Sequence, residues 1–319
     1  MSSRTKHMDK TPLLLKICKM YYFEDKTQQE ISRIVGISRP QISRLLKKAR
    51  DMKIVEVKLN TPQFTTDEQI SEALEKKYKL KEAIVVETFP AISTRETIGI
   101  ATADFLNSHL KDDQIIGIGW GRTLVSTVDH LIPTLKLSNA IFIPLLGGVG
   151  QQRYEYQVNT LVEKIANAFD SKRYYLYAPA FLDDAETLEH LKKDKNVREV
   201  TDFWKKMNLA LVGIGEPILR SQAFSSYLDM DYVLGLDRLK AVGDICAHFF
   251  DENGRPCKFL DYDERILGIS LDMLKTIPEV IGIAGGKSKV KAMVAAMKSR
   301  YVNSLITDST TARMLLEEE

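Results

Sequence analysis

The stretch from Thr27 to Asp51 constrains the fold most strongly, because it contains two short amphipathic patterns separated by a glycine. Apolar residues recur at helical spacing on both sides of Gly36, which breaks the first pattern. Ser38 begins the second pattern, and Pro40 is tolerated only in the first turn of a helix. Both segments begin with the S/T-x-x-E/Q spacing of a capping box. The stretch therefore predicts a helix-turn-helix.

The second of these helices is basic on one side and apolar on the other. At about 100° per residue, Ser43, Arg44 and Lys47 lie opposite the apolar residues. Such a helix fits a DNA major groove, although a solvated basic helix of an ordinary helical domain is the alternative. The expected apolar stripes are Ile31, Ile34 and Val35, then Ile42, Leu45, Leu46, Ala49 and Met52.

We expect side chains near the start of the basic helix to read base edges and others to hold phosphates. The base-reading candidates are Arg39, Gln41, Ser43 and Arg44, and the phosphate-holding candidates are Thr27, Gln28, Lys47 and Lys48. Ser38 and Pro40, which begin the helix, complete the predicted interface with double-stranded operator DNA.

Composition places this basic surface on a nearly neutral body. The chain has 319 residues, enough for two domains, and a net charge of only +2. Cys18, Cys246 and Cys257 are scattered and lack C-x-x-C spacing, which favours reduced thiols over a disulfide framework or a zinc site. The sequence shows no targeting segment and no apolar run of about 18 residues. We therefore expect a cytoplasmic protein with no membrane partner.

The order of patterns predicts a small domain followed by a larger one. An amphipathic helix at 12–23 should pack behind the helix-turn-helix, and the period-two pattern at 54–60 predicts a short strand, the wing of a winged helix-turn-helix. Pro62 and paired threonines then break both periodicities, so the boundary is expected near 60–66. The expected domains are 1–60, which would bind DNA, and 61–319, whose role the resemblance described below assigns to effector binding and oligomerisation.

The larger domain alternates short apolar runs with helical segments, which predicts an α/β fold with an open, mainly parallel sheet. Gly254 predicts one antiparallel hairpin late in the chain. The expected strands lie within 83–87, 113–120, 140–146, 174–180, 210–215, 280–286 and 304–308, and expected helices include 94–110, 123–130 and 156–169.

Glycines cluster at the predicted carboxyl ends of four strands, where ligands bind in such sheets. Arg122 and Thr123 follow one of these clusters, and Lys287 and Lys289 follow another, so each joins a cation to a helix N-terminus and favours an anion such as phosphate. A solvated helix start is the alternative for the lysines. The clusters are Gly117, Gly119 and Gly121; Gly147, Gly148 and Gly150; Gly213 and Gly215; and Gly285 and Gly286.

The sequence contains no complete nucleotide-binding or catalytic motif. Gly282 is one residue too close to Gly286 for a Walker A loop, and GIGWG lacks the dinucleotide spacing. Asp244 and His248, four residues apart in a strand-like run, would share a face and could form an acid–base pair, although a buried structural aspartate is the alternative. With no metal-ligand spacing, we expect no metal and no cofactor.

A series of motifs runs through the chain from about Leu13 to Leu316: YYFEDKTQQEISRIVGISRPQISRLLKKARDMKIVEV, GIGWGRTL, PLLGGVG, YAPAFL, ALVGIG, VGDICAHFFDENG, IPEVIGIAGGKSKVKA and LITDSTTARMLL. Their order resembles that of SorC-type sugar-responsive transcriptional regulators. The resemblance implies a second domain with the fold of sugar-phosphate isomerases and deaminases, used as a sensor of a phosphorylated sugar or related metabolite. It also implies a dimer or tetramer on a palindromic operator.

The resemblance further implies which residues hold the effector. The phosphate should meet Gly119, Gly121, Arg122, Thr123 and Lys289, with Lys287 beside them, while Gly147, Gly148, Gln157 and Asp244 should line the sugar. One departure concerns the segment PLLGG, which has Leu145 and Leu146 and no lysine. Family members that capture an aldehyde through a lysine there are therefore no guide to this chain.

Two other functions remain open at this stage. The first is a sugar-phosphate isomerase or deaminase with a fused DNA-binding segment, which would need Asp244 and His248 as acid and base. The second is a redox or metal sensor, which would need the three separated cysteines to act together. The favoured reading is a regulator that is not an enzyme.

Overall fold

The computed structural model describes residues 11–55, 66–149, 157–217 and 228–318. They belong to two compact units, one within residues 1–63 and one within 64–319, and each is described by itself. The boundary expected near 60–66 lies mainly outside the described residues. In the described part of the chain, no helix is long and apolar enough to cross a membrane.

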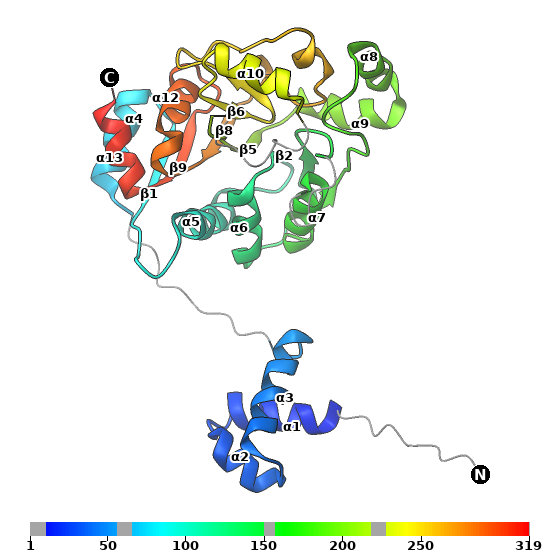
Figure 1. Cartoon of the computed structure of the whole chain (residues 1–319), viewed down its shortest axis with the longest axis vertical. Helices are drawn as coiled ribbons and strands as arrows, with labels where there is room; N and C mark the ends of the chain where they lie inside the picture. Colours follow the sequence, from blue (N-terminus) through cyan, green and yellow to red (C-terminus); the bar gives the residue numbers. More distant parts are fainter. Residues whose placement is uncertain (1–10, 56–65, 150–156, 218–227, 319) are drawn as a thin grey trace, which may run out of the picture. The chain divides into compact units, whose positions relative to one another are not determined.

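The first unit is a three-helix domain that confirms the helix-turn-helix (Figure 1). Its core joins Ile17, Ile31 and Ile42, all fully buried, with residues of the same three helices. Burial of such side chains stabilises the unit by about 1.5–3 kcal/mol each. The helices are α1 (Thr11–Tyr22), α2 (Gln28–Val35) and α3 (Arg39–Asp51).

Both expected capping boxes are present. Glu30 accepts a hydrogen bond from the Thr27 backbone N–H at 2.8 Å, while the Thr27 hydroxyl accepts one from the Glu30 backbone N–H at 3.3 Å. At the second helix, the Gln41 side-chain oxygen accepts from the Ser38 backbone N–H at 3.1 Å. Gly36 takes φ +75° and ends α2, a conformation that glycine adopts without strain. The turn geometry thus follows directly from local sequence.

The prediction that Met52 and Ile34 belong to the core of this unit is wrong. Met52 is 53% exposed because it caps the end of α3, beyond the last turn that packs on the other helices. Ile34 is 52% exposed, at the edge of the short α2. The expected wing strand falls mostly on residues outside the described ranges; Ile54 and Val55, which are described, form no strand.

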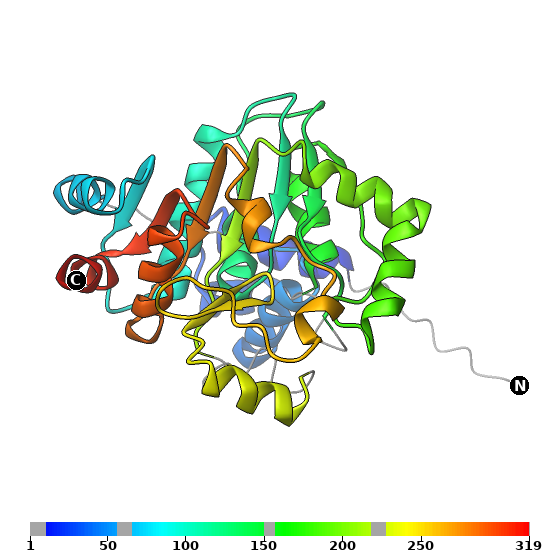
Figure 2. The ribbon, with the colours of Figure 1, turned by 90° about the horizontal axis from the view of Figure 1, so that it is seen from above.

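The second unit contains a seven-stranded sheet in the order β1-β9-β8-β5-β2-β3-β4, and every pairing is parallel. Figure 2 shows its strands side by side across the unit. The α/β prediction is confirmed. The strands are β1 (Glu82–Val86), β2 (Ile115–Ile118), β3 (Ile141–Pro144), β4 (Lys172–Arg173), β5 (Leu209–Gly213), β8 (Glu279–Ile283) and β9 (Ser304–Asp308).

Helices cover both faces of this sheet, so its strands are almost continuously apolar. One face packs on α5 (Thr94–His109), α6 (Arg122–His130) and α7 (Val158–Ala168), which lie in a row in Figure 1. The other packs on α4 (Glu68–Tyr78), α9 (Lys195–Trp204), α12 (Val290–Lys298) and α13 (Ser309–Glu317). Shorter elements are α8 (Ala185–Lys193), α10 (Met230–Arg238), η3 (Tyr262–Arg265), α11 (Leu271–Leu274) and η4 (Lys287–Lys289).

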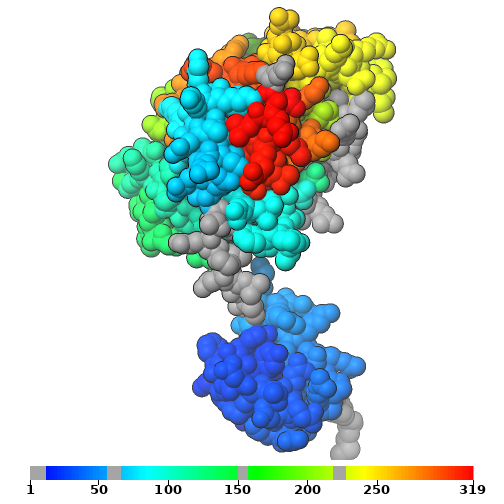
Figure 3. Space-filling view, turned by 90° about the vertical axis from the view of Figure 1, so that its left-hand side faces the viewer, coloured from blue at the N-terminus to red at the C-terminus, as the bar shows by residue number. Residues whose placement is uncertain are grey.

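Helices α4 and α13 are neighbours on the surface of this unit, as Figure 3 shows. The Tyr78 hydroxyl donates to the backbone oxygen of Leu315 at 2.6 Å. The last helix is therefore tied to the first one of the unit, which closes the layer over β1 and β9.

The strand order places a reversal next to β2. From β2 the chain proceeds to β3 and β4 on one side, and then returns to β5 and proceeds to β8 and β9 on the other. In open parallel sheets, ligands bind outside the carboxyl ends of the strands at such a switch point. The ends of β2 and β5 are thus the expected floor of a ligand site.

An antiparallel hairpin of β6 (Gly243–Ile245) and β7 (His248–Phe250) is present, but its turn differs from the expected one. Cys246 and Ala247 make the turn with φ of +50° and +69°. Gly254, with φ +73°, makes a second turn that returns the chain to pair Phe250 with Pro256.

The expected strand at 174–180 is wrong: these residues contain only an isolated bridge at Pro179, and the strand β4 lies just before them. Only Lys172–Arg173 pair with β3, and the chain then leaves the sheet edge. Its backbone groups bond to the loop after β3 instead: Gly148 N–H donates to Ala178 O and Ala180 N–H donates to Gly148 O, both at 2.8 Å. The apolar run predicts a strand, but these bonds to the loop satisfy the backbone groups in place of a sheet ladder.

Candidate DNA-binding and effector sites

Helix α3 presents its basic side to solvent. Ile42, Leu46 and Ala49 are buried in the three-helix core, so the residues between them face outward. Of the ten residues predicted to contact DNA, Gln28 is half-buried and the other nine are exposed. The exposed ones are Thr27, Ser38, Arg39, Pro40, Gln41, Ser43, Arg44, Lys47 and Lys48.

An open depression lies where the start of α2 meets the start of α3. It is lined by Thr27, Gln28 and Arg39 together with Tyr21, Asp25, Lys26 and Gln29, which sequence reasoning missed. The free backbone N–H groups at a helix start favour a negative charge such as a DNA phosphate, whereas the carboxylate of Asp25 opposes it. Lys26 stood beside the capping residue in the sequence and could have been included on that ground.

At the switch point of the sheet, the loops after β2 and β5 approach too closely for side chains. A Cβ at Gly213 would lie 2.9 Å from the Trp120 backbone oxygen, and one at Gly119 would lie 3.2 Å from the Leu211 backbone oxygen. Gly119 N–H also donates to Leu211 O at 2.9 Å. These glycines keep the carboxyl ends of neighbouring strands together.

Two further glycines open the predicted phosphate site to solvent. Gly121 (φ +135°) precedes α6 and Gly286 (φ +102°) precedes η4, and a Cβ at either would meet nothing within 4 Å. Arg122 and Thr123 therefore begin one helix, and Lys289 ends the short turn that leads into α12. Both helical starts follow strands adjacent to β5.

Electrostatic coupling links the cations of these two starts. Burial lowers the pKa of Lys289, and the charges of Arg122 and Arg95 lower it further, whereas those of Asp244 and Glu216 raise it. Sequence reasoning missed Arg95, which lies outside the glycine clusters, and Glu216, which directly follows Gly215 but carries a negative charge. Lys287 is exposed, and within the described ranges it has no side-chain hydrogen bond or ion pair with the others.

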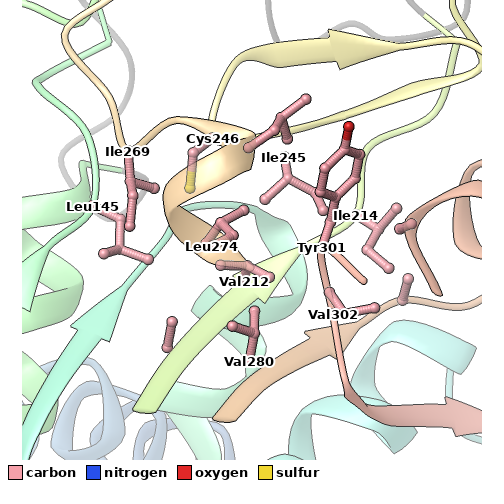
Figure 4. Close-up of a cluster of buried hydrophobic side chains, with 14 of the residues drawn as sticks. Leu145, Val212, Ile214, Ile245, Cys246, Ile269, Leu274, Val280, Tyr301 and Val302 are labelled. Atoms are coloured by element: carbon pink, nitrogen blue, oxygen red, sulfur yellow. The ribbon is translucent and has the colours of Figure 1, made fainter. Parts of the chain in front are cut away.

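Asp244 is the buried carboxyl group of the site. Only 4% of it is exposed, and its Oδ2 accepts a hydrogen bond from Ala247 N–H at 3.2 Å. Burial raises the pKa of Asp244 to about 7, although the hydrogen bond and the charge of Lys289 oppose the shift. Ile245 and Cys246 of the same hairpin lie among buried side chains near the end of β5 (Figure 4).

The expected sugar-lining loop lies after β3. A Cβ at Gly148 would lie 3.5 Å from Gln157 Oε1, and the Gln157 amide donates to Val149 O at 3.3 Å. Gly147 is enclosed more tightly, because a Cβ there would lie 2.5 Å from Ala178 O. Leu145 is fully buried below this loop.

The acid–base pair predicted for one strand does not form in that way. Asp244 pairs with Phe249 across the hairpin while Ile245 pairs with His248, so Asp244 and His248 project from opposite faces. Burial lowers the pKa of His248 to about 4, which leaves it neutral at pH 7. Within the described ranges no group of His, Cys, Asp and Glu side chains could hold a metal ion.

Comparison with known proteins covers both units. Residues 62–317 match the family described as "Putative sugar-binding domain", and residues 15–52 match "Sigma-70, region 4", a helix-turn-helix family. The sorbitol operon regulator of Klebsiella pneumoniae is 31% identical over 97% of this chain and 99% of its own. The deoxyribonucleoside regulator of Bacillus subtilis is 29% identical over the same shares.

A crystal structure of the full-length sorbitol operon regulator SorC from Klebsiella pneumoniae matches the fold. It has a TM-score of 0.73 and 30% sequence identity, and the match covers 97% of this chain and 100% of that one. Sequence family, relatives and fold agree along nearly the whole length. The chain belongs to the SorC family of DNA-binding transcriptional regulators with a sugar-binding domain.

Proposed function

We propose that this regulator changes its affinity for operator DNA when a phosphorylated sugar or related metabolite binds at the carboxyl ends of β2, β3, β5 and β8. One observation carries the proposal: Arg122 and Lys289, at two helical starts that follow strands adjacent to β5, are coupled electrostatically beside the buried Asp244. Such a site offers cations and backbone N–H groups to a phosphate. Asp244 and Gln157 offer oxygen and amide groups to sugar hydroxyls.

We infer that the protein acts as a binding protein, not as an enzyme. The pKa of Asp244 lies near neutrality, but His248 projects away from it and is neutral. An acid–base pair can act in catalysis only where both groups reach the same substrate. Incubation with a panel of sugar phosphates should give no turnover; product formation that disappears in Asp244→Asn would instead favour an isomerase or deaminase.

We further propose that it works as a homo-oligomer in the cytoplasm. A dimer would present two copies of α3 to the half-sites of a palindromic operator, about 34 Å apart for one helical turn. Light scattering of the full chain with and without operator DNA tests this expectation, and a monomer on DNA would contradict it.

The DNA interface is tested by two substitutions on α3. Arg44→Ala should cost about 1–3 kcal/mol of operator binding and relax base preference at one position, because a bidentate contact to a base edge is lost. Lys47→Ala should weaken binding to all sequences alike and reduce the salt slope by about one unit, because a phosphate contact is lost. Fluorescence anisotropy across salt concentrations measures both. Lys136→Ala, in the second unit, is the control.

The effector site is tested by thermal unfolding with phosphorylated and unphosphorylated sugars. A ligand at 100 times its Kd adds about 2.7 kcal/mol to the free energy of unfolding, so a raised Tm identifies it. The shift should require the phosphate and should largely disappear in Arg122→Ala. Equal shifts from a sugar and its phosphate would argue against the assigned phosphate position.

A further inference from the structure

Glu216 places a carboxylate inside the predicted phosphate site. It follows β5, which lies between β8 and β2 in the sheet. The loop after β2 supplies Arg122 and the loop after β8 supplies Lys289. Because carboxyl ends of parallel strands meet at one edge, Glu216 emerges between the two cationic loops.

The contacts of Glu216 are those that a bound phosphate would use. Its Oε2 accepts a hydrogen bond from the Ser288 hydroxyl at 3.1 Å. Its Oε1 lies 4.0 Å from Arg122 Nη2, and its charge raises the pKa of Lys289 against the effect of burial. The side chain is 19% exposed, whereas Arg122 is 51% exposed. The carboxylate is thus held on the inner side of the arginine, toward η4.

We propose that Glu216 is an internal competitor of the effector phosphate: it holds Arg122 and Ser288 until the phosphate displaces its carboxylate from them. This inference rests on the function proposed above. Two anions near one set of cations repel each other by several kcal/mol when solvent is partly excluded. A phosphate must therefore overcome the carboxylate, which lowers affinity for weak anions.

This arrangement makes Glu216 a specificity-determining residue. A neutral sugar cannot replace the carboxylate of Glu216 at Arg122 and Ser288. It would leave the charges of Arg122 and Glu216 without compensation. A phosphate near neutral pH carries more charge than a carboxylate and more acceptor oxygens, so it can take over both partners and meet Lys289 as well. The site would then respond to phosphorylated sugars and ignore the free ones.

The test is isothermal titration of the full chain with inorganic phosphate. Glu216→Gln keeps the shape of the side chain and removes its charge, so it should tighten phosphate binding by about tenfold. Glu216→Ala should tighten it as well, which provides a second variant should the glutamine fail to fold. Glu72→Gln, an exposed carboxylate on α4, is the matched control and should leave the affinity unchanged.

The outcomes separate this inference from the function on which it rests. Unchanged or weaker phosphate binding in both Glu216 variants, together with loss of binding in Arg122→Ala, overturns the competitor role and leaves the phosphate site in place. No phosphate binding by wild type or any variant overturns both proposals. Tighter binding in the Glu216 variants that still depends on Arg122 supports both.

Discussion

Gly215→Ala is expected to lose effector binding and to reduce the free energy of unfolding by a few kcal/mol. A Cβ at this position would lie 1.8 Å from Asp244 Oδ1 and 2.9 Å from its Cγ. Neither side has room to move, because Gly215 N–H donates to Asp244 O at 2.9 Å and Asp244 itself is buried. Overpacking of a well-packed site typically costs about 1–3 kcal/mol, and displacement of a hydrogen-bonded carboxylate adds to it.

Urea unfolding measures the stability term, and phosphate titration measures the binding term. Gly148→Ala is the control for stability, since a Cβ there would meet only Gln157 Oε1 at 3.5 Å and Ala178 O at 3.8 Å, which are ordinary contacts. It should unfold like wild type. If Gly215→Ala binds phosphate and unfolds as wild type does, Asp244 is not held in the position described.

Local sequence signals predicted the DNA-binding unit well because its turns are made by residues close in sequence. Thr27 with Glu30, Ser38 with Gln41, and Gly36 each act within four residues, and the structure has all three features. The errors arise where tertiary packing decides. Periodicity alone cannot show that Met52, at the end of α3, points away from the core.

The α/β fold was also predictable, because buried parallel strands are continuous apolar runs between helices. The failures were at elements whose backbone bonds are not in the main sheet. Residues 174–180 bond to the loop after β3, and the hairpin turn at Cys246 and Ala247 uses positive φ in residues that seldom adopt it. The sequence pattern therefore predicts one continuous strand where the structure has a turn. As a result, it places Asp244 and His248 on the same face, whereas they lie on opposite faces of the hairpin.

The glycine-rich loops indicated where an anion would bind, since glycine marks close approach of backbones. Arg95 lies outside these clusters, and Glu216, although it directly follows Gly215, has the charge opposite to the one expected in an anion site. Glu216 meets Ser288 across 72 positions. Only the order of the strands, with β5 between β8 and β2, brings these residues to one edge.

The second large effect is expected for Asp244→Asn, which should be more stable than wild type at pH 8 and unable to sense effector. The pKa of Asp244 is raised to about 7 by burial, against about 3.9 in an unfolded chain. Below pH 4 both states are protonated there. As pH rises from 4 to 7 the unfolded state ionises first, so the folded state loses stability, and the penalty is complete above pH 7.

An asparagine side chain does not ionise, and its oxygen can still accept a hydrogen bond from Ala247 N–H. The free energy of unfolding of the variant at pH 8 should therefore exceed that of wild type by on the order of 2–4 kcal/mol. The gain is reduced because Lys289 loses an opposite charge. Urea unfolding at intervals from pH 5 to pH 8 measures it, with Asp272→Asn, an exposed carboxylate of α11, as control. If the free energies of unfolding of wild type and variant differ by the same amount at every pH in this range, Asp244 is already ionised in the folded protein at pH 5.

A buried carboxyl group that costs this much stability is retained for what it binds. The same variant should therefore fail to bind a sugar phosphate at the pH where it is most stabilised.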